Sequence, residues 1–113
     1  MYKRQAPDTL AEVQFSTIVE SVGEIPIVGV IDRLVLSQDS ALIIDFKTNQ
    51  EVPSSIDEVP LGILKQMGAY AASMQKVFPK KNIELGIIWT HSAELMKIDV
   101  NRAVSSIGSI RMT

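Results

Sequence analysis

Two aspartates and a lysine lie close together in a β-rich part of this sequence. Asp32 belongs to the run 29–34 (GVIDRL), and Asp45 and Lys47 belong to the run 43–48 (IIDFKT). Both runs are rich in β-forming residues, which predicts two strands. Because side chains alternate between the faces of a strand, Asp45 and Lys47 share a face. Carboxylate oxygens are the ligands that hard cations prefer, so these residue types could hold a divalent ion.

The polar turn 37–40 (SQDS) joins the two runs and predicts how they pair. A hairpin centred between Gln38 and Asp39 pairs Leu36 with Ala41 and places Asp32 opposite Asp45. Directly opposed side chains have Cβ atoms about 5 Å apart, and like charges at such a pair are destabilising unless something compensates them. A divalent cation is the obvious compensator, which favours a metal site here. The pairing alone leaves a second interpretation open, in which Asp45 and Lys47 are solvated at a strand end and Asp32 forms an ordinary surface pair.

Composition limits the class of protein. The 113 residues suit one domain, 46% are hydrophobic and 21% are charged, which is an ordinary globular balance. Without cysteine, a metal must be held by oxygen or by the single histidine, His91, which we expect at the surface. The net charge of −2 counts against a stand-alone nucleic-acid binder, but not against a catalytic module fed by a larger partner. The absence of a long apolar run or a signal peptide predicts a cytoplasmic location and no membrane.

The elements follow the order βββαββα along the chain. This order predicts an α/β fold with a mixed sheet. The spacing of apolar residues predicts strands over 10–19, 27–36, 41–48, 82–90 and 93–98, and helices over 61–77 and 100–110. The helix 61–77 then crosses over between the third and fourth strands. Asp57 and Glu58 suit the start of this helix, and Pro60 suits its first turn. Asp99 could cap the last helix.

These motifs together resemble the PD-(D/E)XK nuclease superfamily, and within it the RecB-like exonucleases. The resemblance covers residues 10–98. It rests on Gly29 and Asp32 of one strand, Asp45 and Lys47 of the next, and the motif Q-x-x-x-Y formed by Gln66 and Tyr70. Glu12 and Phe15 resemble the E-x-P-F segment of the family's first strand, with Gln14 where proline is common. The chain also resembles the nuclease domain that ends the bacterial AddA helicase-nuclease subunit.

The resemblance implies a restriction-endonuclease-like core, with residues 99–113 as a C-terminal helix or tail of the same domain. The family's core usually begins with a further helix that carries another metal ligand, and no such helix is visible here. We therefore expect the chain, residues 1–113, to be a fragment of a large helicase-nuclease.

The resemblance also implies a reaction. Asp32, Asp45 and the backbone carbonyl of Phe46 would hold Mg²⁺, with Mn²⁺ as a substitute. A metal-activated water oriented by Lys47 would hydrolyse a phosphodiester bond, and Gln66 and Tyr70 would lie beside the lysine and the DNA. The implied function is a DNA exonuclease domain of recombination repair. Its partners would be a single strand fed by a helicase motor and an AddB-like subunit, with ATP used only by the helicase region.

Two other functions stay open at the level of sequence. A docking module of the same fold could bind a partner subunit without catalysis, although it would have no reason to keep Asp32, Asp45 and Lys47. A Cas4-like nuclease usually carries cysteines for an iron-sulfur cluster, and this chain has none. Glu12 could lie near the metal or pair with a neighbouring strand. Arg33, on the opposite face from Asp32, could form a structural salt bridge or contact DNA.

Overall fold

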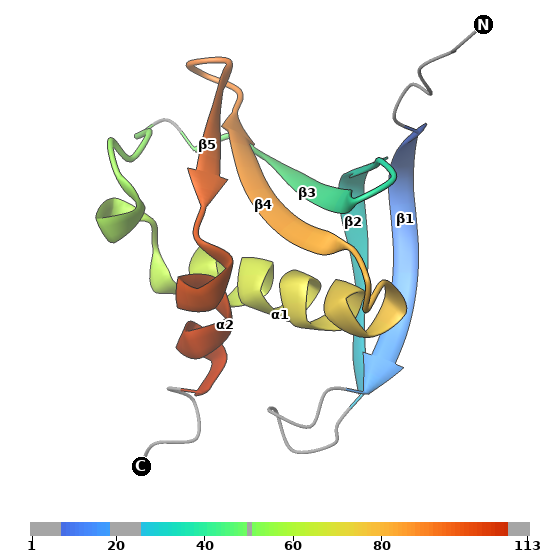
Figure 1. Ribbon diagram of the computed structural model, residues 1–113. Helices are drawn as coiled ribbons and strands as arrows, with labels where there is room; N and C mark the ends of the chain where they lie inside the picture. Colours follow the sequence, from blue (N-terminus) through green and yellow to red (C-terminus); the bar gives the residue numbers. More distant parts are fainter. Residues whose placement is uncertain (1–7, 19–25, 50, 109–113) are drawn as a thin grey trace, which may run out of the picture.

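A five-stranded mixed sheet with two α-helices forms the fold in the computed structural model (Figure 1). The structure describes all residues except 1–7, 19–25, 50 and 109–113. The elements in chain order are β1 (Asp8–Ile18), β2 (Pro26–Leu36), β3 (Ser40–Lys47), the short 3-10 helix η2 (Ile56–Glu58), α1 (Leu61–Val77), β4 (Asn82–Trp89), β5 (Glu94–Ile98) and α2 (Val100–Gly108).

The strands lie in the order β1-β2-β3-β4-β5. Neighbouring strands are antiparallel except β3 and β4, which are parallel. A parallel pair needs a crossover connection, and α1 provides it across one face of the sheet (Figure 1). The predicted α/β class, the order βββαββα and the crossover are therefore confirmed. Val19 and Ile110, predicted in the first strand and last helix, lie outside the described residues.

The start of α1 differs from the prediction. Asp57 and Glu58 lie in η2 and not in the first turn of α1, which contains no acidic residue. Pro60 is the N-cap of α1 and precedes its first turn. The proline explains both differences, because it keeps the preceding residue, Val59, extended (φ −68°, ψ 128°) and so separates the two helices.

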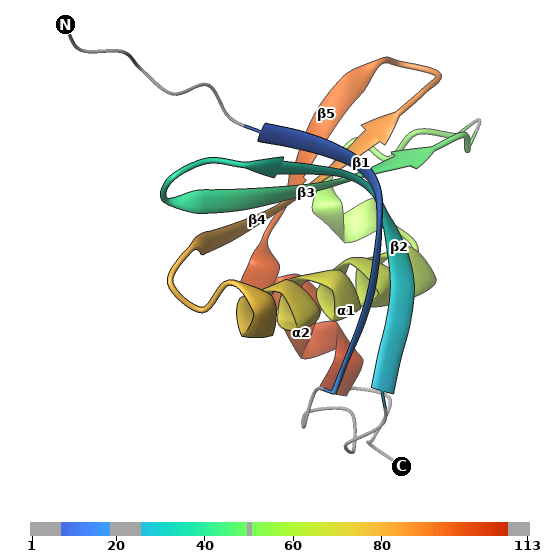
Figure 2. The same cartoon turned by 90° about the vertical axis from the view of Figure 1, so that its right-hand side faces the viewer.

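The β2–β3 hairpin pairs Leu36 with Ala41, as the sequence predicts, and is regular as far as Arg33 and Ile44. The regular pairing ends one step before Asp32 and Asp45. On the other side of β2, pairing with β1 is also interrupted at Asp32, opposite Glu12. Glu12 has a φ of 55°, which is uncommon outside glycine, and β1 and β2 bend together along their length (Figure 2). Asp32 therefore lies where regular pairing is absent on both sides of its strand.

The core lies between the sheet and α1, and α2 packs on α1 (Figures 1 and 2). Its fully buried large side chains include those of Ile31, Ile43, Met67, Leu85, Ile87 and Trp89. The described residues contain no helix long and apolar enough to cross a membrane.

Side-chain hydrogen bonds fix the start of α2 and the turn between β2 and β3. Asp99 caps α2 as predicted, since its Oδ2 accepts from the backbone N–H of Arg102 at 3.2 Å. The ammonium of Lys81, just after α1, donates to the carbonyl oxygens of Ser37 and Gln38. The lysine thereby fastens the β2–β3 turn to the end of the crossover.

Gly68 permits the close crossing of α1 and α2, and we predict that Gly68→Ala destabilises the protein by about 2 kcal/mol or more. An added Cβ would lie 2.1 Å from the carbonyl oxygen of Ala103, so the helices would have to separate. Gly62→Ala, in the same helix, is the matched control because a Cβ there meets nothing within 4 Å. Urea unfolding should show the loss for Gly68→Ala only. Equal stabilities of the two variants would contradict this role of Gly68.

Candidate active site

The side chain of Asp32 bonds to the backbone of β3 just beyond the point where regular pairing of β2 with β3 ends. Its Oδ2 accepts a hydrogen bond from the backbone N–H of Phe46 at 2.9 Å. A side-chain carboxylate thus takes a backbone donor that lies just beyond the end of the β2–β3 ladder. This bond fixes Asp32 against the segment of β3 that carries Asp45 and Lys47.

Asp45 is almost completely buried, with 3% of its surface exposed. Burial is the largest influence on its carboxyl group and raises its pKa. Lys47, whose Nζ lies 2.8 Å from Asp45 Oδ2, opposes the shift, while the neighbouring carboxyl of Asp32 adds to it. The pKa of Asp45 is raised overall. The fold therefore holds two carboxyl groups together, and one ammonium only partly compensates them.

A chain of hydrogen bonds extends from Lys47 through α1 to β2. Lys47 Nζ donates to Gln66 Oε1 at 2.8 Å, Gln66 Nε2 donates to the Tyr70 hydroxyl at 2.9 Å, and that hydroxyl donates to the carbonyl oxygen of Val30 at 3.0 Å. Gln66 and Tyr70 are four residues apart on α1, so they project from one face of the helix. The structure thus brings Asp32, Asp45, Lys47, Gln66 and Tyr70 into one cluster, and their predicted catalytic roles remain predictions.

Tyr70 is held in this chain by an aromatic contact with β1. Its ring meets the ring of Phe15 edge to face, with centroids 5.7 Å apart and planes at 82°. Gly29 makes room for both rings, because a Cβ there would lie 3.1 Å from Phe15 and 3.3 Å from Tyr70. Burial and the charge of Asp45 raise the pKa of the Tyr70 hydroxyl, which therefore keeps the proton that it donates.

The donor atoms at this site fit a hard divalent cation. Asp32 and Asp45 offer carboxylate oxygens, and the Phe46 carbonyl is the third predicted ligand. In the described part of the chain, no group of three or more acidic or histidine side chains gathers to hold a metal. His91 lies exposed at the turn after β4. Magnesium usually keeps several waters, so a site with few protein ligands suits it.

Arg33 and Glu12 lie beside this cluster, around a hollow lined by Ala11, Glu12, Asp32, Arg33 and Phe46. The guanidinium carbon of Arg33 lies 5.8 Å from the centroid of the Phe46 ring, a cation–π distance. No carboxylate within the described ranges forms an ion pair with Arg33, so the structural salt bridge considered for it is not found there. The contact with Phe46 was not foreseen, although alternation along both strands would place the two side chains on one face.

Comparison with known proteins agrees with this geometry. The family model of the PD-(D/E)XK nuclease superfamily matches residues 2–105, so the chain belongs to this superfamily. Its members are nucleases that generally use divalent metal ions. A search of curated proteins found no significant match to the chain.

The raised pKa of Asp45 predicts that Asp45→Asn makes the protein more stable at neutral pH when no divalent cation is present. Above the raised pKa the buried carboxyl is charged and destabilises the fold, and below its ordinary pKa it is neutral in both the folded and unfolded states. The melting temperature of Asp45→Asn should therefore exceed that of the wild type by a few degrees at pH 7 and approach it at low pH.

The exposed Asp39 of the β2–β3 turn offers a matched control, and Asp39→Asn should leave the melting temperature unchanged. A wild type that is more stable than Asp45→Asn at pH 7 without metal would show that Lys47 fully compensates the buried charge.

Proposed function

We propose that this chain is a Mg²⁺-dependent DNA exonuclease domain of a recombination-repair helicase-nuclease. The observation that carries the proposal is the buried carboxyl of Asp45, held between the carboxyl of Asp32 and the ammonium of Lys47. Two acidic side chains and one ammonium at a gap in the sheet are groups that can carry out metal-dependent phosphodiester hydrolysis. Membership of the PD-(D/E)XK superfamily supports the same chemistry.

In this proposal Asp32, Asp45 and the Phe46 carbonyl hold the ion, and Mn²⁺ substitutes for Mg²⁺. A bound divalent ion supplies Lewis acidity and lowers the pKa of a water ligand. The ammonium of Lys47 has three N–H donors and contributes beside the ion. The ammonium forms an ion pair with Asp45 and donates one hydrogen bond to Gln66, so a further N–H can orient the attacking water or stabilise charge that develops on the phosphate oxygens.

Gln66 and Tyr70 act as positioning residues in this mechanism. A lysine side chain is flexible, and its ammonium must stay near the reacting phosphate to be useful. Gln66 Oε1 holds the ammonium, while the other end of the amide donates to the Tyr70 hydroxyl. The hydroxyl is anchored in turn on the Val30 carbonyl of β2. The helix therefore aligns Lys47 with the strand that carries Asp32.

The wider context of the domain follows from the resemblance to AddA. We propose that a helicase region in the same protein delivers a single DNA strand and that an AddB-like subunit is the partner. The net charge of −2 supports a need for delivery, since a chain with no excess of basic residues attracts polyanions weakly. ATP would be used by the helicase region alone.

The proposal predicts that Asp45→Ala abolishes DNA cleavage, because the variant loses a metal ligand and the partner of Lys47. The assay would follow degradation of linear and circular single-stranded DNA with Mg²⁺ or Mn²⁺. An exonuclease degrades the linear strand only. Asp39→Ala removes an exposed carboxylate of the same hairpin and should keep full activity. Normal cleavage by Asp45→Ala in the complete helicase-nuclease would reject the catalytic assignment, and a complete wild-type enzyme that cuts neither substrate would favour a docking module.

Gln66→Leu should lower kcat about tenfold or more with little change in KM, because the ammonium of Lys47 loses the group that positions it. Gln75→Leu is the matched control, since Gln75 is an exposed glutamine on the same helix. Steady-state kinetics on a fluorescent oligonucleotide would measure both constants. An unchanged kcat for Gln66→Leu would remove Gln66 from the mechanism.

A further inference from the structure

The stacked pair formed by Arg33 and Phe46 is not used by the mechanism above. Arg33 belongs to β2 and Phe46 to β3, and each directly follows one of the two acidic residues in the sequence. Both side chains line the same hollow as Asp32. Phe46 is 38% exposed as a residue, so part of its side chain is open to a ligand. The pair therefore offers an exposed aromatic side chain and a cation beside Asp32, on the face of β3 opposite Asp45 and Lys47.

Arg33 has hydrogen-bond donors that the protein does not use. Its Nε is buried and has no hydrogen-bond partner among the described residues. A buried donor without an acceptor is costly, and such a group in a folded protein calls for an explanation. Glu12 and Asp32 line the same hollow, yet neither forms an ion pair with Arg33 in the described ranges. Because Nε itself is buried, an anion from outside the chain would bind the other N–H groups of the guanidinium, whose charge no carboxylate of the described ranges pairs with.

We propose that Arg33 and Phe46 form a subsite for the nucleotide next to the scissile phosphate. Arg33 donates to a phosphate oxygen of that nucleotide, and the exposed ring of Phe46 stacks on its base. A guanidinium is well suited to phosphate, and aromatic rings bind bases of any sequence by stacking. This inference rests on the proposed function, because it takes the cluster of Asp32 and Asp45 as the place of cleavage.

Phe46 couples this subsite to the acidic cluster. Its backbone N–H binds Asp32 Oδ2 at 2.9 Å, and its side chain carries the contact with Arg33. A nucleotide stacked on the ring is therefore held at a fixed position relative to the carboxyl of Asp32. Arg33 and Phe46 would thus position the strand and would not take part in bond breaking.

Binding of a short single-stranded oligothymidylate, measured by fluorescence anisotropy with Ca²⁺ in place of Mg²⁺, tests this subsite. We expect Arg33→Gln to weaken binding about tenfold and to reduce the slope of log affinity against log salt by about 0.7. Arg33→Lys keeps the charge and should restore the salt slope more than the affinity. Phe46→Leu should weaken binding about fivefold to tenfold, and Phe46→Tyr should keep it.

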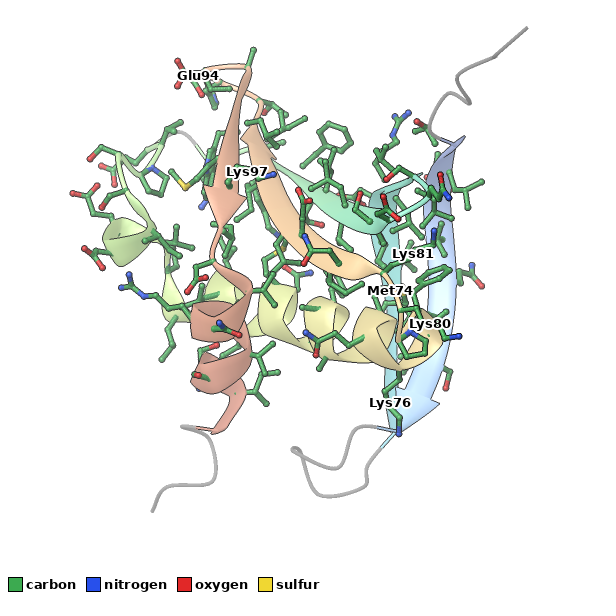
Figure 3. All side chains as sticks on the ribbon, viewed as in Figure 1. Met74, Lys76, Lys80, Lys81, Glu94 and Lys97 are labelled. Atoms are coloured by element: carbon green, nitrogen blue, oxygen red, sulfur yellow. The ribbon has the colours of Figure 1, made fainter. Side chains whose placement is uncertain are left out.

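Lys97→Gln is the matched control for the loss of one positive charge. Lys97 is an exposed cation that pairs with Glu84, and it lies on β5, at the opposite edge of the sheet from β1 (Figure 3). A change in the ligand provides a second measurement, and its first part uses the wild type alone. Oligothymidylates with a single neutral methylphosphonate, placed at each position in turn, should include one that weakens binding to the wild type but has little further effect on Arg33→Gln.

The outcomes separate this subsite from the proposed function. If Arg33→Gln binds the oligothymidylate no more weakly than Lys97→Gln, or if the wild type does not bind it, the subsite is overturned even when cleavage depends on Asp45. If binding depends on Arg33 and Phe46 but no cleavage depends on Asp45, the nucleotide contact stands and the nuclease assignment falls.

Discussion

The close approach of Asp32 and Asp45 is the constraint on which this structure depends. Two neighbouring carboxyl groups repel each other, and burial makes the charge on Asp45 still less favourable. The fold nevertheless brings them together, with Asp32 tied to the Phe46 backbone and Asp45 paired with Lys47. The charge on these carboxyl groups is therefore locally destabilising, and the proposed cation would offset this cost. Carboxyl groups with strongly perturbed pKa values cluster at functional sites.

The rest of the fold keeps the carboxyl groups of Asp32 and Asp45 close together. The interruption at Glu12 and Asp32 lets β1 and β2 bend, and interruptions of this kind often redirect side chains near active sites. The crossover helix α1 covers the sheet and delivers Gln66 and Tyr70 to Lys47. The site is therefore built on strands and a helix packed in one core, which gives its groups little freedom to drift.

The sequence predicted the elements, and it predicted which side chains of the candidate site lie together, because both depend on local patterns. A short polar turn set the β2–β3 register, and alternation placed Asp45 and Lys47 on one face. Other features depend on tertiary contacts that local patterns do not encode. The positive φ of Glu12 occurs where the pairing of β1 with β2 is interrupted, and the sequence around Glu12 does not indicate that interruption. The contact between Arg33 and Phe46 joins side chains of two strands, β2 and β3. The shifted start of α1 shows a local rule, the effect of proline on the residue before it, overriding a favourable charge pattern.

Direct titration with Mn²⁺, followed by the electron paramagnetic resonance signal of the free ion, tests most directly whether Asp32 and Asp45 share one cation. We expect the wild type to bind Mn²⁺, and both Asp32→Asn and Asp45→Asn to weaken that affinity at least tenfold, while Asp39→Asn leaves it unchanged. Equal Mn²⁺ affinity in the wild type and the two site variants would contradict the account, because the paired carboxyl groups would then have no cation to hold.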